Sequence, residues 1–104
     1  DNLMGGTLDN LTSLKNNKNL EIAIRDIRKI DLNSKLFKNI QGIIHFAGSG
    51  SIVPSIENPN FYIENNLHST THLLDSCVKN NIKNFIYAAS SSAPYGKPRP
   101  ENAR

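Results

Sequence analysis

The sequence predicts an α/β protein built on a doubly wound parallel sheet. Short apolar segments that end in small or polar residues alternate with segments whose apolar residues recur at helical spacing. This alternation is typical of βαβ units, whose right-handed crossovers keep neighbouring strands parallel. The central segment begins with the apolar pair Ile43-Ile44 and ends in a loop of small residues that contains Gly48 and Gly50. A glycine loop at the carboxyl end of a strand lets a ligand approach the backbone closely.

The chain before this segment predicts a loop, a short helix and a strand. Residues 1–6 combine turn-forming residues with paired glycines, which favours a loop. Leucines at helical spacing predict a short amphipathic helix over residues 8–14, with Thr7 or Asp9 as its cap. Residues 20–24 alternate weakly between apolar and polar side chains, which favours a strand.

Two further helical segments are expected. A short helix should run from Asp31, its cap, through Phe37, and Gly42 should end it before the central strand. After a turn over residues 54–59, the longest helical signal of the chain begins at Pro59. The residues expected to share its apolar face are Ile63, Leu67, Thr70, Leu74, Cys77 and Val78.

Asn80-Asn81 should end this helix, and residues 85–89 predict another strand that runs into the triplet Ser90-Ser91-Ser92. The proline-rich end over residues 97–104 favours a loosely held tail. We therefore expect a domain over residues 1–96 followed by that tail.

Composition excludes several classes of protein. The net charge of +3 comes from lysines spread along the chain rather than gathered in one patch, so we expect no nucleic-acid binding. No apolar run reaches transmembrane length, so we expect no membrane partner. A single cysteine, Cys77, favours a reducing, cytoplasmic location. The chain starts with Asp1 rather than methionine, which suggests the middle of a longer protein.

Histidines and asparagines in the long helix raise the question of a binding site. His68 and His72 are four residues apart, but no third ligand completes a metal motif, so we expect no metal. Asparagine is a poor residue for a helix interior, yet Asn65 and Asn66 stand together in this one. We expect one of the pair to face a ligand or to bridge to a neighbouring loop.

Polar or bare-backbone residues end each predicted strand, and parallel strands bring such ends to one edge of the sheet. The ends carry carboxylates at Asp1 and Asp26, bare backbone at Phe46-Ala47-Gly48 and hydroxyls at Ser90-Ser91-Ser92. A carboxylate there can accept hydrogen bonds from ribose hydroxyls. Each residue also has a plainer reading, since Asp1 and the serines suit turns and Asp26 suits a solvated loop.

Several short motifs follow one another in a recognisable order: Asp1-Asn2-Leu3 with Gly5-Gly6, Arg25-Asp26-Ile27-Arg28, Ile44-His45-Phe46-Ala47-Gly48, Glu64-Asn65-Asn66, the segment 78–87, Ser90-Ser91-Ser92, and Tyr95-Gly96. The series resembles the NAD-dependent epimerase/dehydratase family, the extended short-chain dehydrogenases, and within it the UDP-sugar 4-epimerases. The resemblance implies a partial Rossmann-like fold.

The resemblance also implies roles for individual residues. The cofactor would be NAD, bound by Asp1, Asn2, Leu3, Gly6, Asp26, Ile27, Phe46, Ala47, Gly48 and Asn66, with Asn65 the less favoured alternative to Asn66. The carboxylate of Asp1 would favour NAD over NADP by repelling a 2′-phosphate. The nucleotide sugar would contact Gly50, Ser51 and Ser55, and Ser90 would be the catalytic serine.

The sequence departs from the family pattern in informative ways. The glycine-rich phosphate loop with its preceding first strand, and the catalytic Tyr-x-x-x-Lys motif, do not occur in these 104 residues. One extra residue stands between the serines and Tyr95, and aligning from that side makes Ser91 the catalytic serine. The segment 49–54 also differs from the usual Val-Pro-Arg order.

The expected function is therefore that of a fragment of an NAD-dependent sugar-nucleotide epimerase or dehydratase, which acts by transient oxidation at sugar C4. The parent is expected to form a homodimer, and this chain alone is expected to show no turnover. The alternative is a non-catalytic relic of such an enzyme, whose exposed sheet edge would favour self-association.

Overall fold

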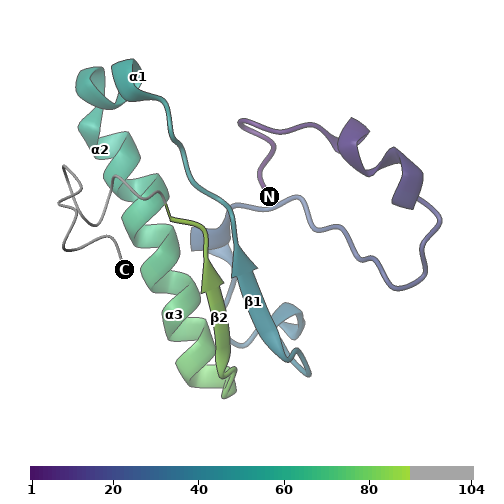
Figure 1. The fold of residues 1–104 in the computed structure, drawn as a ribbon. Coiled ribbons are helices and arrows are strands. Elements are labelled where there is room, and N and C mark those ends of the chain that lie inside the picture. Colours follow the sequence, from purple (N-terminus) through teal and green to yellow (C-terminus); the bar gives the residue numbers. More distant parts are fainter. Residues whose placement is uncertain (90–104) are drawn as a thin grey trace, which may run out of the picture.

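The computed structural model describes residues 1–89, and it has the predicted α/β architecture (Figure 1). Strands β1 (Gly42–His45) and β2 (Asn84–Tyr87) pair in parallel, with Gly42 opposite Asn84 and His45 opposite Tyr87. A Cβ on Gly42 would lie 2.9 Å from both Cβ and the carbonyl oxygen of Asn84. The strands can therefore approach this closely only because Gly42 has no side chain.

The crossover between the two strands is helical over most of its length. It contains α1 (Ile52–Glu57), α2 (Pro59–Tyr62), the π-helical turn η4 (Ile63–His68) and α3 (Ser69–Asn80), the last three forming one continuous helix (Figure 1). The Asn58 side chain caps its start by accepting from the Phe61 N–H at 3.2 Å. Asn81 ends it in the left-handed conformation, with φ of 55°. The predicted helix from Pro59 to Asn80 is confirmed.

The predicted apolar face of this helix is only partly correct. Cys77 is buried as expected, but its buried companions are Ser69, Leu73 and Ser76. The expected face residues Ile63, Leu67, Leu74 and Val78 are 43–84% exposed. The helix meets its neighbours through small serines, whose hydroxyls donate to the carbonyl oxygens four residues earlier and are thereby satisfied. Which face is buried thus depends on the neighbouring elements rather than on the width of the apolar stripe.

The strand predicted over residues 20–24 is wrong. The structure assigns no strand there, and Ile22 and Ile24 are 46% and 56% exposed. The segment and the residue after it make two backbone hydrogen bonds with Asp1. The Arg25 N–H donates to the Asp1 carbonyl oxygen at 2.8 Å, and the Asp1 nitrogen donates to the Ala23 carbonyl oxygen at 3.4 Å. A strand needs a ladder of such bonds along a neighbour, and contact with one residue does not supply it.

Three short 3₁₀ helices complete the described chain. The predicted helix η1 (Leu8–Leu14) is present and capped by Thr7. Helix η2 (Ile27–Lys29) is capped by Asp26. Helix η3 (Lys35–Phe37) is shorter than predicted and is capped by Ser34, because Asp31 instead accepts from the Asn33 N–H in the preceding turn.

The core lies where α3 packs on η2, η3 and β1. It consists of Phe37, Leu73, Cys77 and Ile82, with Ile27, Ile30, Ile43 and Phe85 packed around it. Burial raises the pKa of the Cys77 thiol. His72 and Asn80 tie α3 to the loop after η2 through bonds to the carbonyl oxygens of Ile30 and Leu32, at 2.7 and 2.8 Å. This packing fixes the helix beside the carboxyl end of β1.

Candidate functional site

A cavity of about 240 Å³ opens at the carboxyl end of β1. Segments far apart in the sequence meet there, because the chain start lies beside the segment that leads into η2 (Figure 1). The cavity is lined by Asp1, Asn2, Met4, Gly5, Gly6, Arg25, Asp26, Ile27, Phe46, Ala47, Gly48, Ser49, Asn65 and Ser69. Three of the predicted strand ends, those at Asp1, Asp26 and Phe46, therefore share one site.

Most of the proposed cofactor residues line this cavity, but some proposed site residues do not. Leu3 and Asn66 are not part of its lining: the Leu3 N–H donates to the Asp1 carboxylate, and Asn66 contacts the loop after β1. Of the proposed substrate residues, Gly50, Ser51 and Ser55 are not part of the lining. The Ser55 hydroxyl donates to the Ile52 carbonyl oxygen. Ser90 and Ser91, the candidate catalytic serines, lie outside the described residues, as does the tail over residues 97–104.

The sequence reasoning missed Met4, Gly5, Arg25, Ser49 and Ser69 as lining residues. Arg25 and Gly5 were visible as members of their motifs, and Ser49 as part of the loop after β1. Nothing in the local pattern marked Ser69, which lines the cavity and directly follows the π-helical turn η4. Such π-helical turns are frequent at functional sites.

Asp26 is held by Arg28 rather than free in a solvated loop. Its Oδ1 accepts from the Arg28 backbone N–H and Nε, both at 3.0 Å, and its Oδ2 accepts from Nη2 at 2.6 Å. The hydrogen bonds and charge of Arg28 lower the pKa of Asp26 to about 2. Arg28 also reaches Glu64 at 3.4 Å, so the same ion-pair cluster connects η2 to the turn η4. Within the described residues, Asp26 thus contributes little net negative charge to the cavity.

Asp1 presents a second carboxylate to the cavity. Its Oδ1 accepts from the Leu3 N–H at 2.5 Å, and Leu3 itself takes the left-handed conformation with φ of 60°. A Cβ on Gly6 would come within 4.0 Å of Oδ2, so the glycine leaves the approach to that oxygen open. An ionised carboxylate can only accept hydrogen bonds, which suits the hydroxyls of a sugar.

Asn65 and Asn66 both contact the loop after β1. This agrees with the expectation that one of the pair bridges to a neighbouring loop. Asn66 Oδ1 accepts from the Ser49 N–H at 2.8 Å, and its Nδ2 donates to the Ser49 carbonyl oxygen at 2.9 Å. Asn65 Nδ2 donates to the Ser49 hydroxyl at 2.9 Å. The two asparagines therefore fix the backbone and the side chain of Ser49 at the cavity wall.

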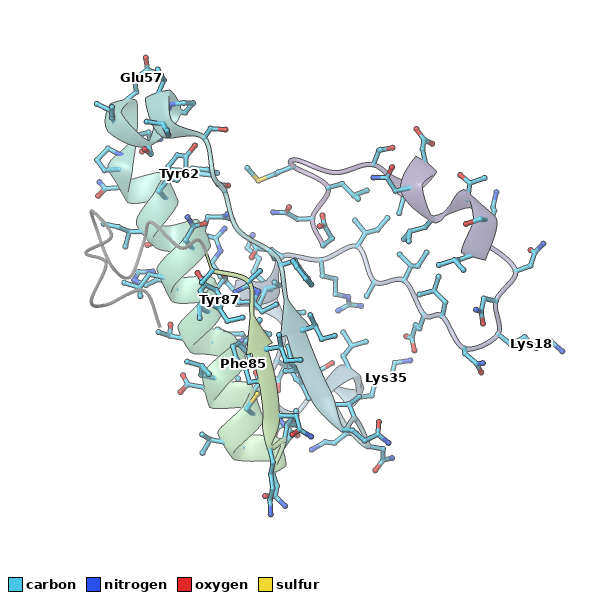
Figure 2. The ribbon with its side chains drawn as sticks, in the orientation of Figure 1. Lys18, Lys35, Glu57, Tyr62, Phe85 and Tyr87 are labelled. Atoms are coloured by element: carbon cyan, nitrogen blue, oxygen red, sulfur yellow. The ribbon has the colours of Figure 1, made fainter. Side chains whose placement is uncertain are left out.

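Other classes of site receive no support from the described part of the chain. No group of three or more histidine, cysteine, aspartate or glutamate side chains in residues 1–89 is arranged to hold a metal ion. None of the helices in that range is both long and apolar enough to cross a membrane. The lysines in that range are exposed, and Lys18 and Lys35 lie on separate parts of the surface (Figure 2).

Comparison with known proteins identifies relatives of this chain. Residues 6–104 match the model of the NAD dependent epimerase/dehydratase family. A bifunctional UDP-glucose 4-epimerase and UDP-xylose 4-epimerase of Pisum sativum is 37% identical over 83 residues, which are 78% of this chain and 23% of the relative. A putative UDP-glucose 4-epimerase of Methanocaldococcus jannaschii is 38% identical over 95 residues, which are 88% of this chain and 31% of the relative.

A solved structure agrees with these relatives. The UDP-N-acetylglucosamine 4-epimerase from Methanobrevibacter ruminantium M1, in complex with UDP-N-acetylmuramic acid, superposes on the whole chain with a TM-score of 0.87 and 33% identity. The chain spans 33% of that structure, and 23–31% of the two relatives named above. The fold is thus a partial Rossmann-like α/β fold, and the chain belongs to the NAD-dependent epimerase/dehydratase family.

Proposed function

We propose that the protein carrying this chain is an NAD-dependent UDP-sugar 4-epimerase, and that this chain forms the nucleoside side of its cofactor site. The observation that carries the proposal is the cavity at the carboxyl end of β1, where Asp1, Ile27 and Phe46 come together from distant segments. Ligands of open α/β sheets bind at this edge. The similarity to UDP-sugar 4-epimerases supports the same assignment.

The cavity fits part of a dinucleotide. At about 240 Å³ it is smaller than the roughly 300–1,000 Å³ of pockets that enclose drug-sized ligands, so it suits a nucleoside rather than the whole cofactor. Asp1 supplies the acceptor for ribose hydroxyls, and Gly6 and Gly48 contribute only backbone to the cavity lining. The Phe46 side chain, 77% exposed, adds apolar surface for a flat ring.

The charges around the cavity favour NAD over NADP. Because Arg28 already neutralises Asp26, Asp1 is the carboxylate that would repel a 2′-phosphate. Arg25 lines the same cavity and would act in the opposite direction, since a nearby arginine accommodates a 2′-phosphate. We propose that Asp1 dominates, which a comparison of NAD and NADP binding will test directly.

The chemistry proposed for the whole protein is a transient oxidation at sugar C4. Bound NAD would accept a hydride from C4 and would later return it to the same carbon. The residues of this chain would orient the reactants. The segment 46–48 would flank the cofactor, and Gly50, Ser51 and Ser55 would contact the nucleotide sugar. Ser90, or Ser91, would donate a hydrogen bond to the reacting hydroxyl. We propose residues 1–96 as the unit that carries these roles and residues 97–104 as an appended tail.

The alternative, a non-catalytic relic that self-associates, has one observation in its favour. The sheet face away from α3 exposes Ile44 and Ile86 at 63% and 59%. Such a face needs a partner in water, either further chain of the same protein or another molecule. Light scattering and NAD titration of the complete gene product together distinguish the cases, because a relic of this kind should be oligomeric without binding NAD. For the enzyme, a cytoplasmic homodimer remains our proposal.

The proposed function is tested on the complete product of the gene that carries this sequence. We expect NAD to bind with higher affinity than NADP in calorimetry, and UDP-glucose or UDP-N-acetylglucosamine to be converted to its 4-epimer. The 104-residue chain alone should bind NAD weakly and give no turnover, because it contains no Tyr-x-x-x-Lys motif. Absence of both NAD binding and epimerisation in the complete protein refutes the proposal.

A further inference from the structure

We propose that His45 and Thr70 are positioning residues, which hold the cavity-lining segment 46–48 in place through a clamp on one turn of the long helix. The inference deepens the proposed function and rests on it for the identity of the ligand. Neither residue lines the cavity, so both would act through the backbone of the loop that does. The clamp has two anchors, one at each end of that segment.

The anchor at the far end of the segment is the pair Asn66 and Ser49. The Asn66 amide meets both the N–H and the carbonyl oxygen of Ser49, at 2.8 and 2.9 Å. The side-chain amide thus pairs with the loop as a neighbouring strand would. The helix also approaches the loop closely here, since a Cβ on Gly48 would lie 3.4 Å from Asn66 Oδ1.

The anchor at the near end is the buried pair His45 and Thr70. His45 is the last residue of β1 and is 3% exposed. Its ring lies 5.4 Å from that of Tyr87, which is labelled on β2 in Figure 2. Its Nε2 lies 2.9 Å from the Thr70 hydroxyl oxygen. Thr70 in turn lies 2.6 Å from the Asn66 carbonyl oxygen.

These two contacts fix the tautomer of His45. A carbonyl oxygen can only accept, so the Thr70 hydroxyl must donate its proton to Asn66. The hydroxyl oxygen is then an acceptor for His45, whose Nε2 must carry the proton. Hydrogen bonds thus run in one direction, from the imidazole through Thr70 to the Asn66 backbone, and Asn66 then holds Ser49.

The two anchors therefore belong to one unit. Thr70 and Asn66 are one helical turn apart and are joined to each other, so loosening one affects the other. The segment 46–48 spans the short distance between His45 and Ser49 and has little freedom while both ends are held. Removing the Thr70 hydroxyl should leave the His45 N–H without its partner and release the near end of the cavity wall.

The test uses amide hydrogen exchange of Ser49 in the 104-residue chain, measured by NMR. Thr70→Val keeps the shape of the side chain but removes the hydroxyl, and we expect Ser49 to exchange about tenfold faster. Thr70→Ser should restore slow exchange. Thr71→Val is the matched control, because Thr71 is exposed and donates only within its own helix, to the His68 carbonyl oxygen at 3.0 Å. Equal Ser49 exchange in Thr70→Val and Thr71→Val overturns the clamp.

Two further readings separate the clamp from the proposed function. NAD titration of the same proteins should show weaker binding for Thr70→Val than for Thr71→Val. The complete, unmodified protein gives a second result. If it binds no NAD while Ser49 exchange still responds to Thr70→Val, the proposed function fails and the clamp stands. Long-range ¹H–¹⁵N spectra of the unmodified chain report the His45 tautomer without any substitution. A proton on Nε2 supports the clamp, and a proton on Nδ1 overturns it.

Discussion

The Asn66 side chain offers the most direct test of how the helix organises the cavity. Asn66→Ala removes both hydrogen bonds to Ser49. Each partly buried bond contributes about 0.5–1.5 kcal/mol to stability, so their loss costs roughly 1–3 kcal/mol. The substitution also brings a gain, because alanine exceeds asparagine in helix propensity by up to about 0.7 kcal/mol. The observed change in the free energy of unfolding is the difference of the two effects.

Asn60→Ala provides the matched control for that gain. Asn60 lies exposed in α2, in the first turn of the continuous helix, so its replacement brings at most the propensity gain and no loss at Ser49. We expect Asn66→Ala to be about 1–3 kcal/mol less stable than Asn60→Ala, which corresponds to a melting temperature roughly 5–20 °C lower. Thermal and urea unfolding followed by circular dichroism measure the difference. If the two variants melt together, the contact between Asn66 and the loop contributes nothing and the reasoning is wrong.

Three further changes follow from the charges and packing. Burial lowers the pKa of His45 below 6.5, so the unfolded chain binds the proton more readily than the folded chain. The free energy of unfolding should therefore fall as the pH drops below about 6.5. His45→Gln should reduce this dependence in melting curves measured at several pH values. The pKa of Asp26 is lowered from 3.8 to about 2, so its ion pair with Arg28 stabilises the fold fully above about pH 4. This stabilisation is lost between about pH 4 and 2. Arg28→Met should remove that part of the acid unfolding curve, and an unchanged curve contradicts the pairing. Gly42→Ala should lower the melting temperature by several degrees, because the new Cβ would lie 2.9 Å from β2, whereas Gly5→Ala, with open space around it, should not.

Local pattern was enough to predict the elements whose structure depends on nearby residues. The helix that begins at Pro59 and the strand at Ile43-Ile44 were visible because apolar periodicity, Pro59 and Asn81 all act within a few residues. The order of short motifs also indicated the family, which residues 6–104 match. The carboxylates of Asp1 and Asp26 and the glycine backbone after β1 could be located in the same way.

The structure decided what depends on neighbours distant in sequence. Residues 20–24 have a strand-like pattern, but Asp1 alone does not form a ladder with them, so they remain irregular. The buried face of α3 carries Ser69 and Ser76 because a close neighbour favours small side chains, which periodicity does not reveal. The same holds for Asn65 and Asn66: composition marked them as unusual in a helix, but only the turn η4 beside the loop after β1 directs both amides to Ser49. Sequence thus determined which groups were present, and packing determined which of them meet, because hydrogen bonds form only between groups that the fold brings within about 3 Å of each other.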